Sequence, residues 1–229
     1  MVRVPYGDGG FCIDSTEVTT TEYAAFLDAV SKGATIVTPP GGVCNWNTSV
    51  AASTTGYCTA GTTDPNAHPN RPMACVNWCD AYAYCAWAGK RMCGAVGGGP
   101  VPFGSVITPS NQQYAACSAN ATKAYPYGSS YVKGDCNTRD LYDASPAVAD
   151  VESFAACVGG FPGIYDIAGN VEEWLDSCET FGDGGATDIC HESGDAYDFN
   201  ATGPARCDND DSDYRSVQGP DVGIRCCSP

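Results

Sequence analysis

The chain has 229 residues, a formal net charge of −16, 17% charged residues and 43% hydrophobic residues. That length suffices for one large domain, or two small ones, with a sizeable core. The acidic excess argues against nucleic acid and anionic membrane surfaces as partners. No run approaches the roughly 18 apolar residues of a membrane span, so membrane insertion is not expected. The composition indicates a soluble exported protein that binds cations.

The 15 cysteines are the strongest compositional signal. Their spacings include no C-x-x-C pair, and His68 and His191 are the only histidines, so a zinc site is not indicated. We interpret the cysteines as a disulfide framework formed in an oxidising compartment, which predicts a secreted, extracellular or cell-surface protein. Because the number is odd, one thiol is free, bonded to another chain, or reactive. Two local pairings are predicted, Cys44 with Cys58 and Cys178 with Cys190.

The N-terminal part predicts a short strand at residues 10–14 followed by a helix. Thr19 and Glu22 have the spacing of a capping box, in which each side chain bonds to the other residue's backbone. Apolar residues then recur at helical spacing as far as Gly33, which ends the helix. Residues 34–71 are rich in Thr, Gly, Pro and Asn and predict a long loop held by Cys44 and Cys58.

A second helix is predicted over residues 78–88, with Asn77 as its cap and Gly89 as its left-handed stop. Lys90 and Arg91 follow, and we interpret them as charge partners of the helix end rather than ligand-binding residues. A third, short helix is predicted over residues 110–117, with Ser110 and Gln113 at capping-box spacing. A last strand is predicted over residues 222–227, with Cys226 and Cys227 on opposite faces. No repeat or linker divides the chain, which predicts one domain over residues 1–229.

The stretch at residues 161–175 has the sequence FPGIYDIAGNVEEWL. Acidic and amide side chains lie here among apolar residues and beside a bend of small residues. Inward-facing carbonyls next to a carboxylate can form an oxygen cage for calcium. The same pattern is compatible with a plain surface turn whose acids are solvated, and the spacing by itself favours this second interpretation.

Three sequons begin at Asn47, Asn120 and Asn200. They would carry glycans only in a host that has the glycosylation machinery.

Four stretches together resemble the formylglycine-generating enzyme family, also called sulfatase-modifying factors. They are residues 14–26 (DSTEVTTTEYAAF), 76–91 (VNWCDAYAYCAWAGKR), 163–174 (GIYDIAGNVEEW) and 223–226 (GIRC). They occur in the family's order and span nearly the whole chain. The resemblance implies a C-type-lectin-like α+β fold with little regular secondary structure. It also implies that the first and last strands meet, so that Cys12 pairs with Cys226 or Cys227.

The resemblance implies a structural calcium ion at the turn within residues 161–175. The implied ligands are the Asp166 side chain, the carbonyls of Gly169 and Val171, and the Glu173 carboxylate. Mixed carboxylate and carbonyl oxygens are the ligands that calcium takes. A second family calcium site would involve Asn137.

Active members of the family oxidise a substrate cysteine to formylglycine with two cysteines that bind copper(I), for which thiolates are suitable ligands. The two cysteines are separated by four residues. The matching segment here is residues 203–215, GPARCDNDDSDYR. Cys207 falls on the first cysteine and Ser212 on the second. Acidic neighbours would raise the pKa of a Cys207 thiol, and we therefore expect Cys207 in a disulfide.

Two further interpretations concern other cations. Some relatives are iron-dependent oxygenases, which need three histidines or two histidines and a carboxylate. His68 and His191 do not supply the first site, and the second is possible only by count. The run at residues 208–213 is interpreted as a solvated acidic loop; as a cation site it lacks the Gly and distal Glu of an EF-hand loop.

The hypothesis that the sequence favours is a secreted, disulfide-stabilised, calcium-binding relative that has lost catalysis. It would act as a binding or structural module with a protein or glycan ligand, and self-assembly into a fibre or coat remains open. The alternative is a copper-dependent formylglycine-generating oxidase that uses Cys207 and a non-aligned cysteine.

Overall fold

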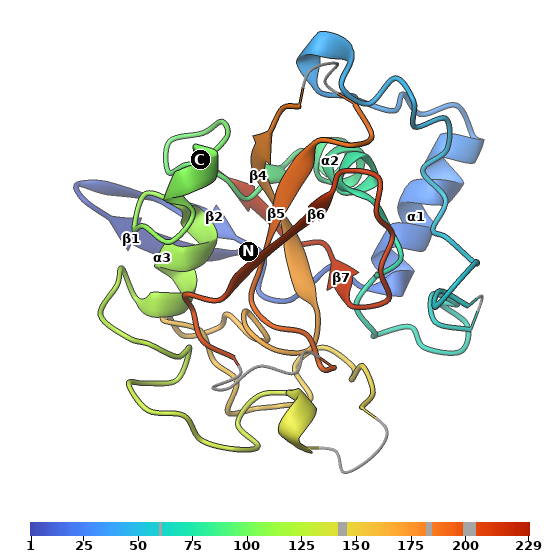
Figure 1. The fold of residues 1–229 in the computed structure, drawn as a ribbon. Coiled ribbons are helices and arrows are strands. Elements are labelled where there is room, and N and C mark those ends of the chain that lie inside the picture. The colour runs from blue at the N-terminus through green and yellow to red at the C-terminus, as the bar shows by residue number, and fades with distance from the viewer. Residues whose placement is uncertain (60, 142–145, 182–184, 199–204) are drawn as a thin grey trace.

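The computed structural model describes residues 1–59, 61–141, 146–181, 185–198 and 205–229. These residues form the predicted α+β fold, with short helices and two small sheets joined by long loops (Figure 1). The sequon at Asn200 lies outside the described residues.

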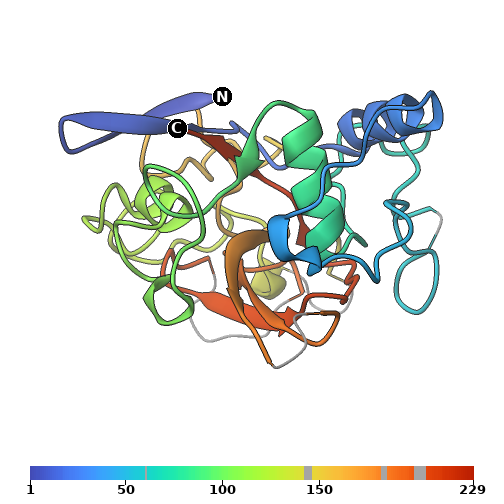
Figure 2. The same cartoon turned by 90° about the horizontal axis from the view of Figure 1, so that it is seen from above.

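The first sheet has the strand order β1-β2-β8-β3. It contains β1 (Val2–Tyr6), β2 (Gly9–Ile13), β3 (Arg91–Met92) and β8 (Cys226–Ser228). The predicted entry strand at residues 10–14 corresponds to β2, which also pairs with β1 in a hairpin. The pairing of β2 with β8 brings the two chain ends into one sheet, and Figure 2 shows them near each other.

The second sheet has the order β6-β5-β4-β7 and crosses the middle of the molecule (Figure 1). It contains β4 (Glu172–Glu179), β5 (Ile189–Ser193), β6 (Asp210–Tyr214) and β7 (Val222–Gly223). The expectation of an acidic loop at residues 208–213 was wrong, because most of this run forms β6. Every residue of β6 is exposed, so its acidic side chains stay in solvent, and charged side chains are compatible with a strand at the edge of a sheet.

The predicted last strand at residues 222–227 is divided between the two sheets. Its first part is β7, which runs parallel to β4, and its last part is β8, which pairs with β2 and β3. Ile224 and Arg225 form the crossing, and both are buried. At this crossing the Arg225 side chain donates to Glu173 of β4 and to the carbonyls of Asp14 and Asp166, which holds the crossing in place.

The first two helices begin as predicted. Helix α1 (Thr20–Ser31) has a complete capping box between Thr19 and Glu22. Helix α2 (Trp78–Trp87) has a complete capping box between Asn77 and Asp80, and Gly89 follows it with φ of 71°. The amide of the sequon residue Asn47 donates to Asp80 at 2.7 Å.

Helix α2 is anchored to β4 by two indole hydrogen bonds. Trp78 donates to the Leu175 carbonyl at 2.7 Å, and Trp174 donates to the Val76 carbonyl at 3.0 Å. A buried indole N–H without an acceptor would be costly, so this reciprocal pair fixes where the helix crosses the sheet.

Helix α3 (Gln112–Ser118) begins differently from the prediction. Its cap is Asn111, whose side chain accepts from the Gln113 backbone N–H at 3.0 Å. The Gln113 side chain does not reach back to Ser110, because it is buried and donates to Glu173. Three short 3₁₀ helices lie in the loops: η1 (Pro40–Gly42), η2 (Phe103–Ser105) and η3 (Arg139–Leu141).

All 15 cysteines lie within the described residues, and 14 of them form seven disulfides. The disulfide framework is confirmed, and so is the local pair Cys178–Cys190. The pairs are listed here in chain order: Cys44–Cys79, Cys58–Cys75, Cys85–Cys226, Cys93–Cys227, Cys117–Cys207, Cys136–Cys157 and Cys178–Cys190.

Two predicted pairings were wrong. Cys44 and Cys58 do not bond to each other; each instead ties the loop of residues 34–71 to the start of α2, through Cys79 and Cys75. Cys12 is the free cysteine, although β2 does pair with β8.

The last two cysteines point to opposite sides of β8, as strand alternation predicts. Cys226 belongs to a hydrophobic cluster around α1, α2 and Trp174, whereas Cys227 belongs to a second cluster around β1, β2 and α3. Their disulfides to Cys85 and Cys93 therefore tie one strand into both cores. None of the helices in the described parts of the chain could cross a membrane.

Candidate functional site

The turn between residues 166 and 173 is buried and has an unusual backbone. Asp166, Gly169 and Asn170 have positive φ values of 51°, 88° and 66°. A Cβ atom on Gly169 would lie 2.8 Å from the Asn137 carbonyl oxygen, so only glycine fits there. The turn packs directly against the segment around Asn137, whose carbonyl accepts from the Asn170 N–H at 2.8 Å.

The turn presents backbone oxygens without donors. Within the described residues, no hydrogen bond reaches the carbonyl oxygens of Gly169 or Val171. Both residues are buried, and a buried carbonyl is normally paired. These are the two carbonyls predicted as calcium ligands.

Glu173 is the second residue of β4 and lies beside Arg225, and both are almost completely buried. Arg225 Nε donates to Glu173 Oε1 at 2.8 Å, and Gln113 Nε2 donates to Glu173 Oε2 at 2.9 Å. Arg225 also donates to the carbonyls of Asp14, Tyr165 and Asp166 at 3.1, 2.9 and 3.0 Å. One guanidinium therefore links the entry segment, the turn and the strand.

The carboxylates around Arg225 outnumber it. Asp166 Oδ2 accepts from the Glu152 N–H at 2.7 Å, while Glu17 Oε2 has no hydrogen-bond partner and lies 4.0 Å from Arg225. Burial raises the pKa of Asp166 to about 6 and that of Glu173 to about 7. Burial, and then the charge of Asp166, also raises the pKa of Glu17. The cluster has surplus negative charge when its acids ionise.

The residues present fit a calcium ion at the turn. The free Gly169 and Val171 carbonyls and the surplus carboxylate charge are what a hard cation needs. Each carboxylate oxygen can accept a second interaction, so the Arg225 and Gln113 contacts do not exhaust Glu173. Asn137 lies against the turn, and its amide donates to Asn170 Oδ1 at 2.9 Å. Among the described residues, no group of three Asp, Glu, His or Cys side chains is placed to hold a metal by itself, so an ion at the turn would need carbonyl ligands as well.

Cys207 is bonded to Cys117 of α3, as expected. Ser212, at the position of the second copper cysteine, lies on the exposed strand β6 opposite His191. The remaining thiol, Cys12, lies on β2 in the other sheet. The structure therefore brings no two free thiols together.

The two histidines are not placed as an iron site. His191 lies on β5, where Nε2 is 2.9 Å from the Phe103 carbonyl oxygen and Nδ1 is 3.2 Å from the Asp211 carbonyl oxygen. His68 lies in the loop before α2, where its carbonyl accepts from Thr20.

Several buried polar residues were not predicted from the sequence. Arg225 lies in a motif that carried the resemblance, but nothing in its local pattern marks it as the centre of a cluster. Glu172 and Glu192 are 4% and 3% exposed, and within the described residues their side chains form no hydrogen bond or ion pair. Burial, and then neighbouring acids, raises their pKa values to about 10 and about 9. One signal in the sequence concerns Glu172, which directly precedes Glu173. Adjacent residues of a strand point to opposite faces of the sheet, so the two side chains had to lie on different faces.

Residues 7–228 match the family model described as "Sulfatase-modifying factor enzyme 1-like domain". The chain belongs to this family. It is 29% identical to the mouse formylglycine-generating enzyme over 189 residues, which cover 69% of this chain and 44% of that protein. It is 27% identical to the Streptomyces coelicolor formylglycine-generating enzyme over 194 residues, covering 72% of this chain and 56% of that protein.

The family also contains proteins named as inactive. The chain is 30% identical over 112 residues to the bovine inactive C-alpha-formylglycine-generating enzyme 2, covering 46% of this chain and 33% of that protein. The chain thus spans about half, or less, of the curated relatives it matches.

Solved structures share the fold. PvdO from Pseudomonas aeruginosa superposes with a TM-score of 0.62 at 21% identity, over 98% of this chain and 82% of that one. CarF superposes with a TM-score of 0.61 at 19% identity, over 96% and 86%. The predicted family and α+β fold are confirmed.

Proposed function

We propose that this sulfatase-modifying-factor-like domain is a non-catalytic, calcium-binding module of an oxidising compartment. The observation that carries the proposal is the Cys117–Cys207 disulfide. The disulfide uses Cys207, which is at the position of the first of the two copper-binding cysteines. The position of the second is held by Ser212. Copper(I) requires soft thiolate ligands, and a cystine sulfur with a neighbouring serine does not supply them.

The proposed role for calcium is structural. Asp166, Glu173 and the carbonyls of Gly169 and Val171 would hold the ion, with Asn137 supporting the turn from the next segment. Bound calcium would neutralise part of the buried negative charge and hold a turn with three positive φ values. The family's C-type-lectin-like scaffold would then present variable loops to a protein or glycan ligand.

The seven disulfides indicate folding in an oxidising compartment, which supports secretion or display at a cell surface. Each should stabilise the fold by about 2–4 kcal/mol, which offsets the weak core of a loop-rich chain. Such a module could also assemble with copies of itself into a fibre or coat. Light scattering at increasing protein concentration tests for this self-assembly.

Thiol counting and copper binding test the loss of catalysis. We expect one alkylated thiol in the unfolded, unreduced protein, and none in Cys12→Ser. We also expect no stoichiometric copper(I) uptake in competition with a chromogenic chelator. Tight one-to-one copper binding that Cys207→Ser abolishes would overturn the proposal in favour of the oxidase.

Calcium binding is tested by thermal unfolding with calcium, magnesium or EGTA. Calcium should raise the midpoint more than magnesium does, and Asp166→Ala should abolish the calcium-dependent part of the shift. The matched control is Asp64→Ala, which removes a loop carboxylate whose Oδ1 accepts from the Asn66 backbone N–H. An identical midpoint in calcium and EGTA would exclude the calcium site.

A further inference from the structure

A cavity of about 790 Å³ lies between the loop of residues 53–62 and the segment of residues 217–221, which leads into β7 (Figure 1). Small-molecule sites have volumes of about 300–1,000 Å³, so this cavity has room for a ligand. Its lining includes none of the candidate calcium ligands, neither cysteine of the Cys117–Cys207 disulfide and neither histidine. It is therefore distinct from the sites described above.

Cys75 joins the two walls of the cavity. It forms a disulfide with Cys58 in the first wall, and its N–H donates to the Gly219 carbonyl in the second wall at 2.8 Å. The Cys75 carbonyl accepts from the Ser53 N–H, also at 2.8 Å. Because these contacts hold the loops in place, a ligand meets a preformed site, and binding costs less conformational entropy.

Opposite charges line the cavity without pairing. Arg71, Asp198 and Asp221 are all lining residues, and each is partly exposed. Within the described residues, no ion pair joins Arg71 to a carboxylate, and no hydrogen bond reaches its guanidinium. The five N–H donors of this guanidinium are therefore open to a ligand.

The charged groups lie within electrostatic range of the Tyr197 hydroxyl, which also lines the cavity. Burial raises the pKa of Tyr197 to about 12; Asp198 and Asp221 add to this rise, and Arg71 opposes it. The hydroxyl therefore stays protonated at neutral pH. It forms no hydrogen bond within the described parts of the chain, and it can both donate and accept.

This arrangement favours a neutral, hydroxylated ligand. An anion would be attracted by Arg71 and repelled by Asp198 and Asp221, and a cation would meet the reverse. A hydroxyl group can accept from a guanidinium and donate to a carboxylate at the same time, so it can join groups of opposite sign. Hydrogen bonds to charged groups are also stronger than those between neutral groups.

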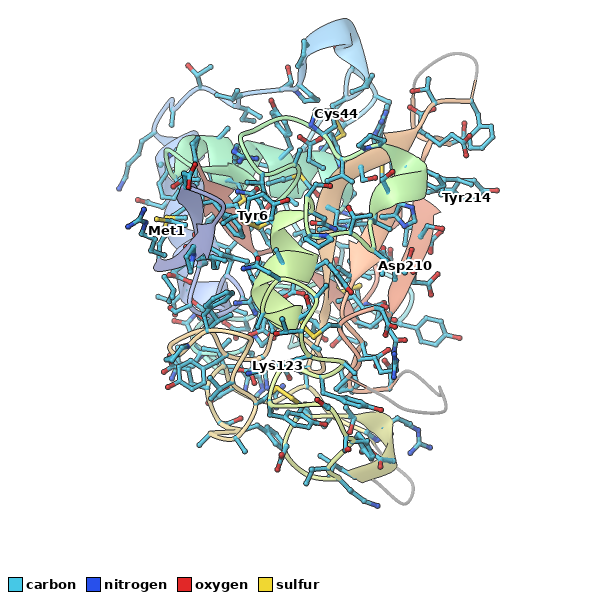
Figure 3. All side chains as sticks on the ribbon, turned by 90° about the vertical axis from the view of Figure 1, so that its left-hand side faces the viewer. Met1, Tyr6, Cys44, Lys123, Asp210 and Tyr214 are labelled. Atoms are coloured by element: carbon cyan, nitrogen blue, oxygen red, sulfur yellow. A yellow bond between two sulfur atoms is a disulfide. The ribbon has the colours of Figure 1, made fainter. Side chains whose placement is uncertain are left out.

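The rim of the cavity adds an aromatic surface. Tyr57 lines the cavity and is 90% exposed, so its ring is free to pack against the C–H face of a sugar ring. Asp213 lines the cavity from β6, whereas its neighbour Tyr214 does not line it and extends outward (Figure 3).

The lining is less suited to a peptide. Peptide sites commonly use an apolar groove or a sheet edge. The described lining includes no Leu, Ile, Met, Phe or Trp, and Asp213 is its one strand residue. A sugar therefore fits this cavity better than a polypeptide does.

We propose that this cavity binds a neutral oligosaccharide. The Tyr57 ring packs on one sugar residue, while Arg71, Tyr197, Asp198 and Asp221 form hydrogen bonds with the hydroxyl groups. The proposal names the ligand class of the binding module proposed above and rests on that role.

The test applies the labelled full chain, in calcium buffer, to a printed array of neutral, sialylated and sulfated oligosaccharides. We expect binding to neutral glycans. In titration calorimetry, the affinity for the best neutral trisaccharide should change less than about twofold between low and high salt, since the ligand carries no charge. The proposal is wrong if no neutral glycan binds, or if only sialylated or sulfated glycans bind.

Variants locate the site. Tyr57→Ala should weaken binding of that trisaccharide at least about tenfold, whereas Tyr214→Ala, which removes an exposed tyrosine outside the cavity, should not. Arg71→Gln should weaken binding by a similar factor, and Arg3→Gln on β1 should not. Far-ultraviolet circular dichroism checks that each variant is folded. Equal effects within either pair would contradict the assignment of the site.

A decaproline peptide, which can pack on an exposed tyrosine, tests the polypeptide alternative. If it binds through Tyr57 and no glycan binds, the ligand is a polypeptide and the proposal is wrong. The thiol, copper and calcium measurements above do not depend on this titration. If they give the expected results and no glycan binds, the sugar ligand is wrong and the non-catalytic, calcium-binding module still stands.

Discussion

Arg225 Nε donates to Glu173 Oε1 at 2.8 Å, with both side chains buried between the two sheets. This pair joins the segment that closes the chain to the strand that follows the candidate calcium turn. The same guanidinium holds three backbone carbonyls, so the crossing between β7 and β8 and the shape of the turn depend on one side chain.

Removal of the guanidinium should be strongly destabilising. Arg225→Met leaves Glu173 buried without its cation and three carbonyls without a donor, and the expected loss is about 3–5 kcal/mol. Lys32→Met is the matched control, because its pair with Asp28 is exposed and contributes about 0.3–0.5 kcal/mol. Urea unfolding of both variants gives the comparison. Similar losses in the two would show that the buried pair is not important for stability.

The Cys117–Cys207 disulfide should contribute more stability than a local one. It spans 90 residues, for which the chain-entropy model gives about 4.5 kcal/mol. Cys178–Cys190 spans 12 residues, for which the same model gives about 3 kcal/mol. Denaturant unfolding of the two double-alanine variants should therefore rank them in that order. The reverse ranking would mean that structure in the unfolded chain or native packing outweighs loop length.

Gly169 should tolerate no side chain. Its φ is 88°, and an added Cβ would lie 2.8 Å from the Asn137 carbonyl oxygen, so Gly169→Ala should cost at least about 1–3 kcal/mol. Gly104 lies in η2 with open space at the Cβ position, and Gly104→Ala should change stability by less than about 0.5 kcal/mol. Thermal unfolding in EGTA separates this backbone effect from any loss of calcium. An equal effect of the two variants would contradict the close approach.

Glu192 should make the fold less stable as pH rises. Its pKa is about 9 in the folded protein, above its ordinary value of 4.5, so the folded state holds a proton that the unfolded chain releases. Stability from this group is therefore complete below about pH 4.5 and is lost as pH rises towards about 9. The free energy of unfolding in EGTA at about pH 5 and about pH 8 measures the fall.

Glu192→Gln should reduce that fall, because glutamine does not titrate, and Glu179→Gln should not. If all three proteins lose the same free energy between the two pH values, Glu192 is not the group responsible.

The sequence by itself determined the features that depend on neighbouring residues. The capping boxes at Thr19 and Asn77, the stop at Gly89 and the alternation of Cys226 and Cys227 are set by contacts within a few positions along the chain, so local rules identify them. Ordered motifs likewise identified the family, and the absence of a second cysteine at Ser212 predicted that Cys207 is not half of a copper pair.

Only the tertiary structure decided which distant groups meet. Gln113 left the predicted capping box because Glu173 binds its amide. Residues 222–227 divided between two sheets, because β7 found its partner in β4 and β8 found its partners in β2 and β3. Cys44 and Cys58 found partners at the start of α2, and Glu192 faces Asp211, because sheet register and loop closure set those neighbours. Such contacts join residues far apart in the chain, and their free energy depends on the whole packed fold, which no local spacing encodes.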